Sequence, residues 1–260
     1  AQEPENAPEI ALKRILPHLA RDERFTRHFL NEVKIQAALS HPNLVRALDF
    51  GREDDSFFMT MELLAGQTLD TLLEALKARG QILAIPAAIE LLRQTLAGIG
   101  YAHSARDKDG RPLGIVHLDL SPRNLFICES GQVKILDFGI ARKTYAEDKK
   151  AHNALIGSPA YLSPEQAREE SVGPQSDLFT LGIVLYEASV GTTLFGNQAT
   201  PFLTLKAITS GLVPPPSNIQ KNYPAKLEAA LYKALDVKPE KRFATAGDFA
   251  HALEEVVKAQ

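Results

Sequence analysis

The first part of the chain is a series of short segments with the two-residue period of β-strands. Residues 10–16 alternate between polar and apolar side chains, which predicts a strand with Ala11 and Lys13 on one face. Residues 44–50 and 57–63 have a similar pattern and are predicted to form two more strands. The charged residues between these two segments are expected to form the turn that joins them.

Helical periodicity appears between the first two strands and dominates after residue 65. In residues 22–39, apolar side chains recur at four-residue steps and Glu32 lies on an adjacent stripe, which predicts an amphipathic helix. Residues 69–78 and 87–103 show the same pattern. Residues 177–190 are almost wholly apolar, so we expect them to form a buried helix.

Strands therefore come first and helices follow, which predicts an α+β fold of two lobes. The small lobe is assigned to residues 1–64 and the large helical lobe to residues 65–260, with a hinge near residues 62–66. A chain of 260 residues with 45% hydrophobic residues is long enough for each lobe to have its own core.

Composition narrows the classes of partner. The net charge of −3 gives no indication of a nucleic-acid partner, and the single cysteine, Cys128, excludes an internal disulfide. No apolar run is long enough to cross a bilayer, and residues 1–20 lack the apolar centre of a signal peptide. We expect a cytoplasmic protein, or the cytoplasmic domain of a larger one.

One stretch carries residues suited to phosphoryl transfer. His117, Asp119 and Asn124 follow the spacing His-x-Asp-Leu-x-x-x-Asn, and Asp137 begins an Asp-Phe-Gly sequence downstream. Such a stretch supplies a carboxylate that orients an attacking hydroxyl, together with oxygen ligands for magnesium. Two apolar runs within residues 125–136, separated by a turn with a glycine, predict a hairpin that holds this loop.

Three more motifs follow in a fixed order. Residues 157–165 end on Ser-Pro-Glu, residues 176–182 begin the predicted buried helix, and residues 239–243 read Pro-Glu-Lys-Arg-Phe. With these motifs, residues 10–257 resemble the protein kinases. The resemblance is closest to eukaryotic-like bacterial serine/threonine kinases of the myxobacterial type.

The resemblance implies transfer of the ATP γ-phosphate to a serine or threonine of a protein substrate, with magnesium as cofactor. Asp119 would orient the substrate hydroxyl, while Asn124 and Asp137 would hold magnesium. Lys13 would hold the α- and β-phosphates and pair with Glu32. The residues that would surround the adenine are Ala11, Met61, Glu62, Leu64 and Phe126.

Other positions of the resemblance concern architecture and specificity. Asp177 would fix the main chain of the catalytic loop, and Phe138 would set active or inactive packing. Glu165 would pair with Arg242 inside the large lobe. Ser158, a small hydroxyl residue in the loop that receives the substrate, favours serine and threonine acceptors.

The chain departs from the kinase pattern at several positions. No glycine precedes Gly51, so the glycine-rich loop that covers the phosphates is missing, and we expect the chain to be a fragment of a longer protein. Leu118 replaces the arginine that clamps a phosphorylated residue, and we expect it to pack against Ile140 or Leu155. Gln36 stands where an apolar residue normally completes an internal stack.

Two other functions compete with a serine/threonine kinase. A kinase-fold scaffold with little catalysis is favoured by Leu118, Gln36 and the missing glycine-rich loop. The scaffold is disfavoured because loss of catalysis commonly removes at least one residue of a set that is complete here: Lys13, Glu32, Asp119, Asn124 and Asp137. A small-molecule phosphotransferase is disfavoured because such enzymes lack the Ser-Pro-Glu loop and the arginine motif of residues 239–243.

Overall fold

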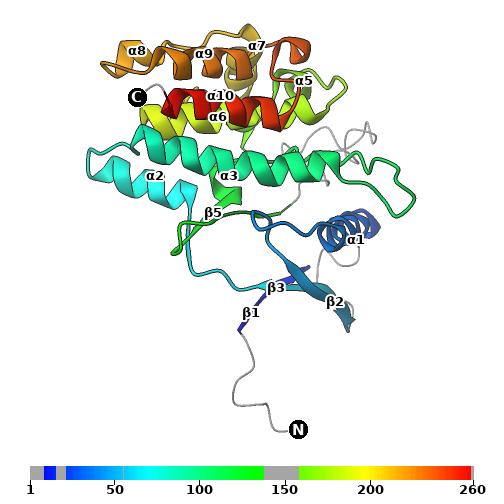
Figure 1. Cartoon of the computed structure of the whole chain (residues 1–260). Coiled ribbons are helices and arrows are strands. Elements are labelled where there is room, and N and C mark those ends of the chain that lie inside the picture. Colours follow the sequence, from blue (N-terminus) through cyan, green and yellow to red (C-terminus); the bar gives the residue numbers. More distant parts are fainter. Residues whose placement is uncertain (1–8, 16–21, 55, 138–157, 259–260) are drawn as a thin grey trace.

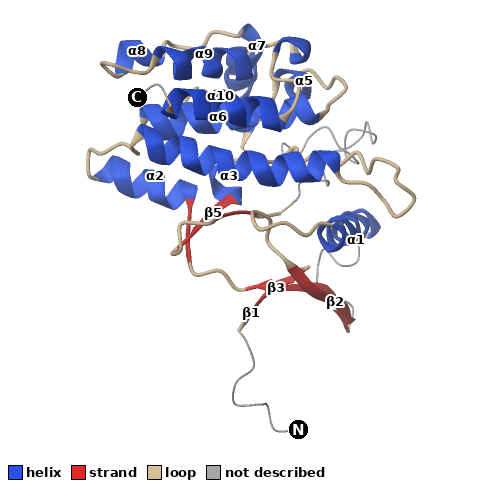
Figure 2. Cartoon of the chain, in the orientation of Figure 1, coloured by secondary structure: helices blue, strands red, loops and turns tan. Residues whose placement is uncertain are grey.

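The computed structural model describes residues 9–15, 22–54, 56–137 and 158–258. A small lobe contains half of the described strands, and the large lobe consists mostly of stacked helices (Figure 1). Figure 2 shows this separation of strands from helices along the molecule. The predicted α+β, two-lobed architecture is confirmed.

The small lobe is an antiparallel sheet with one helix beside it. Its strands β1 (Ile10–Arg14), β2 (Ala47–Glu53) and β3 (Ser56–Glu62) are arranged in the order β1-β3-β2. Helix α1 (Glu23–Ala38) packs against β2 and β3. Among the residues that the structure describes, the buried centre of this lobe is small and consists of Ile15, Phe29, Val33 and Met59.

The strand predicted at residues 44–50 begins later than expected. Leu44 and Val45 belong instead to a connection with the large lobe: Leu44 forms a parallel bridge with Ile135, and the Val45 N–H donates to the Ile135 carbonyl at 3.0 Å. Strand β2 therefore starts at Ala47 and continues into the charged segment that was predicted to be a turn. The first residues of the predicted strand were therefore assigned to the wrong sheet, because Leu44 and Val45 bond to Ile135 of the large lobe.

The large lobe begins with a second antiparallel sheet, in which β4 (Gly66–Thr68), β5 (Leu125–Cys128) and β6 (Val133–Ile135) lie in sequence order. The β5–β6 hairpin confirms the expectation for residues 125–136. Strand β4 was not expected. The α-helices within the described residues of this lobe are α2 (Leu69–Ala78), α3 (Ile85–Ser104), α5 (Pro164–Ala167), α6 (Pro174–Val190), α7 (Pro201–Ser210), α8 (Pro216–Ile219), α9 (Ala225–Ala234) and α10 (Ala246–Val257).

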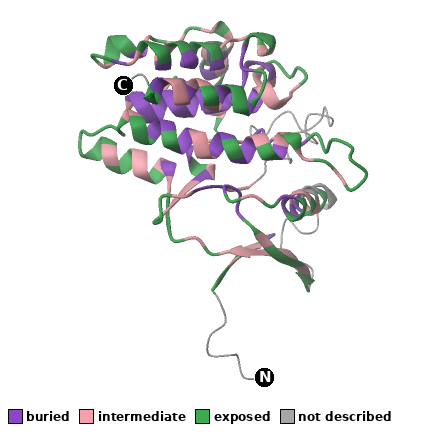
Figure 3. Ribbon diagram, in the orientation of Figure 1, coloured by how far each residue is buried: buried purple, intermediate pink, exposed green. Residues whose placement is uncertain are grey.

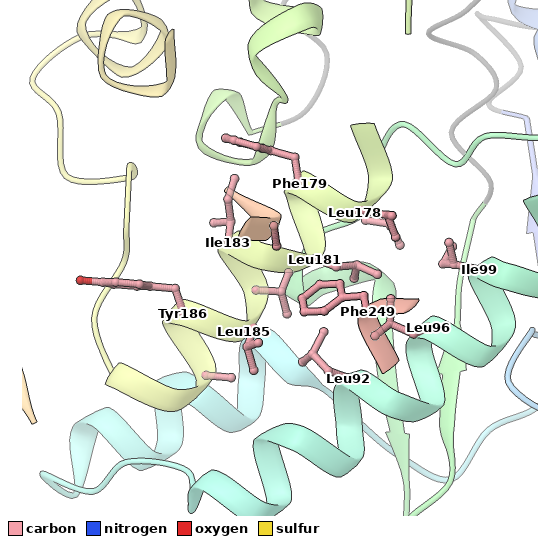
Figure 4. Close-up of a cluster of buried hydrophobic side chains, with 14 of the residues drawn as sticks. Leu92, Leu96, Ile99, Leu178, Phe179, Leu181, Ile183, Leu185, Tyr186 and Phe249 are labelled. Atoms are coloured by element: carbon pink, nitrogen blue, oxygen red, sulfur yellow. The ribbon is translucent and has the colours of Figure 1, made fainter. Parts of the chain in front are cut away.

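Helix α6 is the centre of the large lobe, as its apolar sequence predicted. It packs between α3 and α9, and it appears almost wholly buried in Figure 3. Pro174 occupies its first turn, where the missing N–H costs nothing, and Gly191 ends it in the left-handed region at φ 80°. Figure 4 shows side chains of α6, such as Leu181, meeting Leu92 and Leu96 of α3 and Phe249 of α10.

Side-chain caps fix the ends of several helices. Thr68 accepts from the Thr71 N–H at the start of α2, and Thr245 with Asp248 forms a reciprocal capping box at the start of α10. None of the helices in the described ranges is both long and apolar enough to cross a membrane.

Candidate active site

Three charged side chains from separate elements meet between the lobes. The Lys13 ammonium on β1 lies 2.5 Å from a carboxylate oxygen of Glu32 on α1 and 2.6 Å from one of Asp137, just after β6. Alternation along β1 directs Lys13 to the same face as Ala11, and the helical stripe of α1 presents Glu32 to it. The structure thus brings together residues that are 124 positions apart in sequence.

This cluster has one more negative charge than positive charges. Burial of the Lys13 ammonium works against its charged form, but Asp137 and Glu32 outweigh that effect and raise the Lys13 pKa. Burial raises the Glu32 pKa, and repulsion from Asp137 adds to the increase although Lys13 opposes it. Lys13 therefore stays charged, and the excess negative charge suits a cation.

Asp177, at the start of α6, holds the main chain of the catalytic loop. Its two carboxylate oxygens accept the N–H groups of His117 and Leu118, each at 2.8 Å. One of these oxygens also lies 2.8 Å from Nε2 of His103 on α3. Leu118 is left-handed at φ 62°, a conformation that costs an L-residue about 1–2 kcal/mol. The Asp177 bonds offset that cost.

His117 is a packed residue of the loop. Its Nε2 bonds the Leu136 carbonyl at 3.1 Å, and its Nδ1 accepts the Asp119 N–H at 3.3 Å. These partners require the neutral imidazole with the proton on Nε2. Burial lowers the His117 pKa despite the nearby Asp177, which favours the same neutral form. The ring therefore holds Asp119 in place and ties the loop to the end of β6.

Asn124 is fixed beside Asp119. Its side-chain Nδ2 donates to the Asp119 main-chain carbonyl at 2.7 Å, and the main-chain carbonyl of Asn124 accepts the Leu136 N–H at 2.9 Å. With the amide nitrogen engaged, the Asn124 side-chain oxygen is directed away from that bond. Asp137 follows Leu136 directly, so the hydrogen bond between the main chains of Asn124 and Leu136 holds the two expected magnesium ligands close together. Amide and carboxylate oxygens are the donors that magnesium prefers, so the residues present fit this ion.

The expected adenine-binding residues lie around the junction of the lobes. Ala11 on β1 is the cross-strand partner of Met61 on β3, and Glu62 is the last residue of β3. Leu64 follows in the segment that leads to the large lobe. Phe126 lies on β5, opposite Thr68 of β4.

The loop that would receive a substrate is anchored to α6. It contains a short 3-10 turn, Pro159–Tyr161, and its Tyr161 hydroxyl donates to the Glu187 carboxylate at 2.7 Å. The Tyr161 carbonyl also accepts from the Thr180 hydroxyl at 2.9 Å. Ser158 is exposed immediately before this turn. Glu187 is buried, and sequence reasoning did not identify it because an isolated glutamate in an apolar helix has no distinguishing motif.

The expected pair between Glu165 and Arg242 is present in the large lobe. Two guanidinium nitrogens of Arg242 lie 2.8 Å from the two Glu165 oxygens. The Ser176 hydroxyl donates to one of the same oxygens at 2.6 Å, and the guanidinium lies over the Phe179 ring. The pair links the end of the substrate loop to the start of α6 and to the segment before α10.

Two of the departures from the kinase pattern are buried. Leu118 is buried as expected, but Ile140 and Leu155, its expected neighbours, lie outside the described residues, as does Phe138. Gln36 is only 2% exposed, and its Oε1 has no hydrogen-bond partner among the described residues. Its Nε2 makes a long 3.5 Å bond to the Val45 carbonyl.

Comparison with known proteins agrees with this geometry. Residues 1–255 match the family described as the protein kinase domain. The chain is 36% identical over 245 residues to the tyrosine-protein kinase MasK of Myxococcus xanthus, covering 94% of this chain and 38% of MasK. It is 33% identical over 240 residues to the serine/threonine-protein kinase PrkC of Bacillus subtilis, covering 92% of this chain and 35% of PrkC.

The chain therefore spans little more than a third of the length of these curated relatives. Among solved structures, the PknI kinase domain of Mycobacterium tuberculosis has the same fold, with a TM-score of 0.73 at 22% identity. That match covers 98% of this chain and 88% of the PknI chain. With a family match along almost its whole length, the chain belongs to the protein kinase family, among its eukaryotic-like bacterial members.

Proposed function

We propose that this chain is the catalytic domain of an ATP-dependent serine/threonine protein kinase that acts in the cytoplasm. The observation that supports this most strongly is the contact of Lys13 with both Glu32 and Asp137, while Asn124 holds the main chain of Asp119. These groups come from both lobes, and a purely structural role does not require them to meet. We retain residues 1–64 and 65–260 as the proposed division between the lobes.

The proposed reaction forms a bond between the substrate hydroxyl oxygen and the γ-phosphorus and breaks the bond to the β-phosphate oxygen, releasing ADP. Asp119 orients the hydroxyl and accepts its proton. Lys13 binds the α- and β-phosphates, and Glu32 holds the Lys13 ammonium in place. Asn124 and Asp137 would hold magnesium, which would neutralise phosphate charge when bound. The Asp177 carboxylate, which accepts the main-chain N–H groups of His117 and Leu118, keeps Asp119 in position during the reaction.

The proposal that the phosphate acceptor is serine or threonine has less support than the proposed kinase reaction, because the relatives include both serine/threonine-protein kinases and a tyrosine-protein kinase by name. Ser158, a small hydroxyl residue immediately before the substrate turn, supports serine or threonine. A protein substrate is supported by the loop around Tyr161 and its anchor to α6. Phosphoamino-acid analysis of the product distinguishes the two classes.

A scaffold with the kinase fold is the second candidate, and Gln36 is the observation that favours it. The buried Gln36 side-chain oxygen has no hydrogen-bond partner among the described residues, which makes the packing of α1, the helix that carries Glu32, less stable. The intact contact between Lys13 and Glu32 argues against it.

The test is transfer of labelled phosphate from magnesium–ATP to a general protein substrate. Asp119→Asn should lower the rate about 10²–10⁴-fold, the usual effect of losing a positioned base. Asp137→Ala should abolish transfer. Asp248→Asn, an exposed carboxylate in a helix cap far from the site, is the matched control and should leave the rate unchanged. Wild-type activity in Asp119→Asn, or none in the wild type, would rule out the proposed reaction.

A further inference from the structure

A buried lysine lies behind the segment that joins the two lobes. Lys134 is on β6, and only 10% of its side chain is exposed. Its ammonium lies 2.7 Å from Oε1 of Glu62 and 3.5 Å from the Leu44 carbonyl. A buried ammonium requires such a partner, because an unpaired buried charge is strongly unfavourable. None of the roles assigned above uses this lysine.

Glu62 is held on its main chain as well as its side chain. The same Oε1 that contacts Lys134 accepts the Arg46 N–H at 2.8 Å, and the Glu62 N–H donates to the Arg46 carbonyl at 3.1 Å. The Glu62 carboxylate and the Glu62 N–H are thus both held by the main chain of Arg46. Its own carbonyl lies at the last position of β3, where the chain leaves for the large lobe.

Among the described residues, Glu62 is the carboxylate that contacts Lys134. A cleft of about 320 Å³ opens beside them, lined by residues that include His41, Arg46, Glu62 and Lys134. Burial lowers the His41 pKa, and the positive charge of Lys134 lowers it further, so the imidazole there is neutral. Arg46 is exposed and adds positive charge. If Lys134 were lost, the Glu62 carboxylate would keep the Arg46 N–H as its partner among the described residues, and the side chain, which is 24% exposed, would turn towards water.

We propose that Lys134 is a positioning residue for nucleotide binding, which acts by holding Glu62 in the orientation that presents its main chain to the adenine. This inference rests on the proposed function, because it needs ATP as the ligand. Lys134 is on the large lobe and Glu62 ends the small-lobe sheet, so the ion pair also fixes the junction of the lobes at the point where the adenine would lie. A surface ion pair would have no such effect.

The chain offers a matched control for an ion pair that serves packing alone. Arg93 on α3 lies 2.9 Å from Glu254 on α10, and it likewise connects two elements distant in sequence. This pair is half exposed and far from the junction of the lobes. Arg93→Met and Lys134→Met therefore each remove an ion pair between two elements, half exposed in the first case and largely buried in the second.

The experiment measures ATP affinity by calorimetry and the kinetic constants for ATP in wild type, Lys134→Met, Lys134→Arg and Arg93→Met. Lys134→Met should weaken ATP binding and raise the KM for ATP about tenfold, or about 1.4 kcal/mol, with kcat within about twofold of wild type. Lys134→Arg should keep most of the affinity. Arg93→Met should leave both constants unchanged. Circular dichroism confirms that each variant is folded.

A second variant keeps the inference testable if Lys134→Met destabilises the protein. In Lys134→Met/Glu62→Gln the carboxylate is removed together with its partner, and the amide oxygen can still accept the Arg46 N–H. This double variant should recover at least a third of the ATP-binding free energy that Lys134→Met loses.

ATP affinity in folded Lys134→Met within twofold of wild type would overturn the inference, as would an equal loss in Arg93→Met. These outcomes differ from failure of the proposed function. A wild type that binds ATP in a Lys134-dependent manner but transfers no phosphate would refute the kinase and leave the positioning role intact.

Discussion

Replacement of Asp177 by asparagine tests the idea that the catalytic loop depends on one buried carboxylate. The substitution keeps the shape of the side chain but exchanges one oxygen for an NH2 group. In the structure, both oxygens accept main-chain N–H groups, from His117 and Leu118. An asparagine can serve only one of them, and its NH2 group must face the other donor.

The magnitude follows from these contacts. A hydrogen bond to a charged group contributes about 1.5–3 kcal/mol, and the orphaned buried N–H adds to the loss. Relaxation of Leu118 out of its left-handed conformation would recover about 1–2 kcal/mol, so the loop would shift rather than remain in place. Because Asp119 follows Leu118 directly, we expect kcat to fall about 100-fold, which corresponds to about 2.7 kcal/mol.

The assay is steady-state phosphate transfer together with thermal unfolding of Asp177→Asn. The control is Asp248→Asn, whose carboxylate also accepts a main-chain N–H and a hydroxyl hydrogen bond, both from Thr245, but at an exposed helix cap. The control should retain wild-type kcat. If Asp177→Asn keeps kcat within about threefold of wild type while remaining folded, the loop does not depend on this clamp and the reasoning is wrong.

Three other substitutions test buried polar groups. Gln36→Leu removes a buried oxygen that has no partner within the described part of the chain, and it should raise the free energy of unfolding by about 1–2 kcal/mol in chemical denaturation; a decrease would contradict this. Arg242→Met strands the buried Glu165 carboxylate and should cost about 3–5 kcal/mol, part of which Glu165→Gln should restore in the double variant; additive losses would argue against the pair. Burial raises the Glu187 pKa, so its contribution to stability is greatest at low pH and is lost as the pH rises from its ordinary value through the raised one. The Tm of Glu187→Gln relative to wild type should therefore increase as the pH rises above about 4.3, the ordinary pKa of glutamate, and a constant difference would refute the argument.

Much of the site could be predicted from sequence because its residues occur in spaced motifs. Asp119 and Asn124 lie in one loop, and their spacing alone indicated the chemistry. The pairing of Lys13 with Glu32 required the kinase resemblance, because an isolated lysine on a strand has no distinctive pattern. Its contact with Asp137 at 2.6 Å depends on how the two lobes meet, which local periodicity does not encode.

Contacts between the lobes account for what sequence reasoning missed. The apolar residues Leu44 and Val45 were compatible with either sheet, and only the bonds to Ile135 decide between them. Lys134 reads as an ordinary polar position in a short strand, and its burial follows from the approach of Glu62. Local sequence predicts helices and strands from side-chain period, but it does not specify which element a buried side chain will meet.

The small centre of the N-terminal lobe has a consequence for dynamics. The four buried side chains described in this centre contribute about 6–12 kcal/mol at about 1.5–3 kcal/mol each, before the entropy of ordering is subtracted. The large lobe, by contrast, has a continuous core built around α6. We therefore expect the small lobe to open by local unfolding while the large lobe stays folded, so amide hydrogens of β1 and α1 should exchange faster than those of α6. Each opening would separate Lys13 from Glu32, and a ligand that binds only the closed form would slow the exchange by mass action.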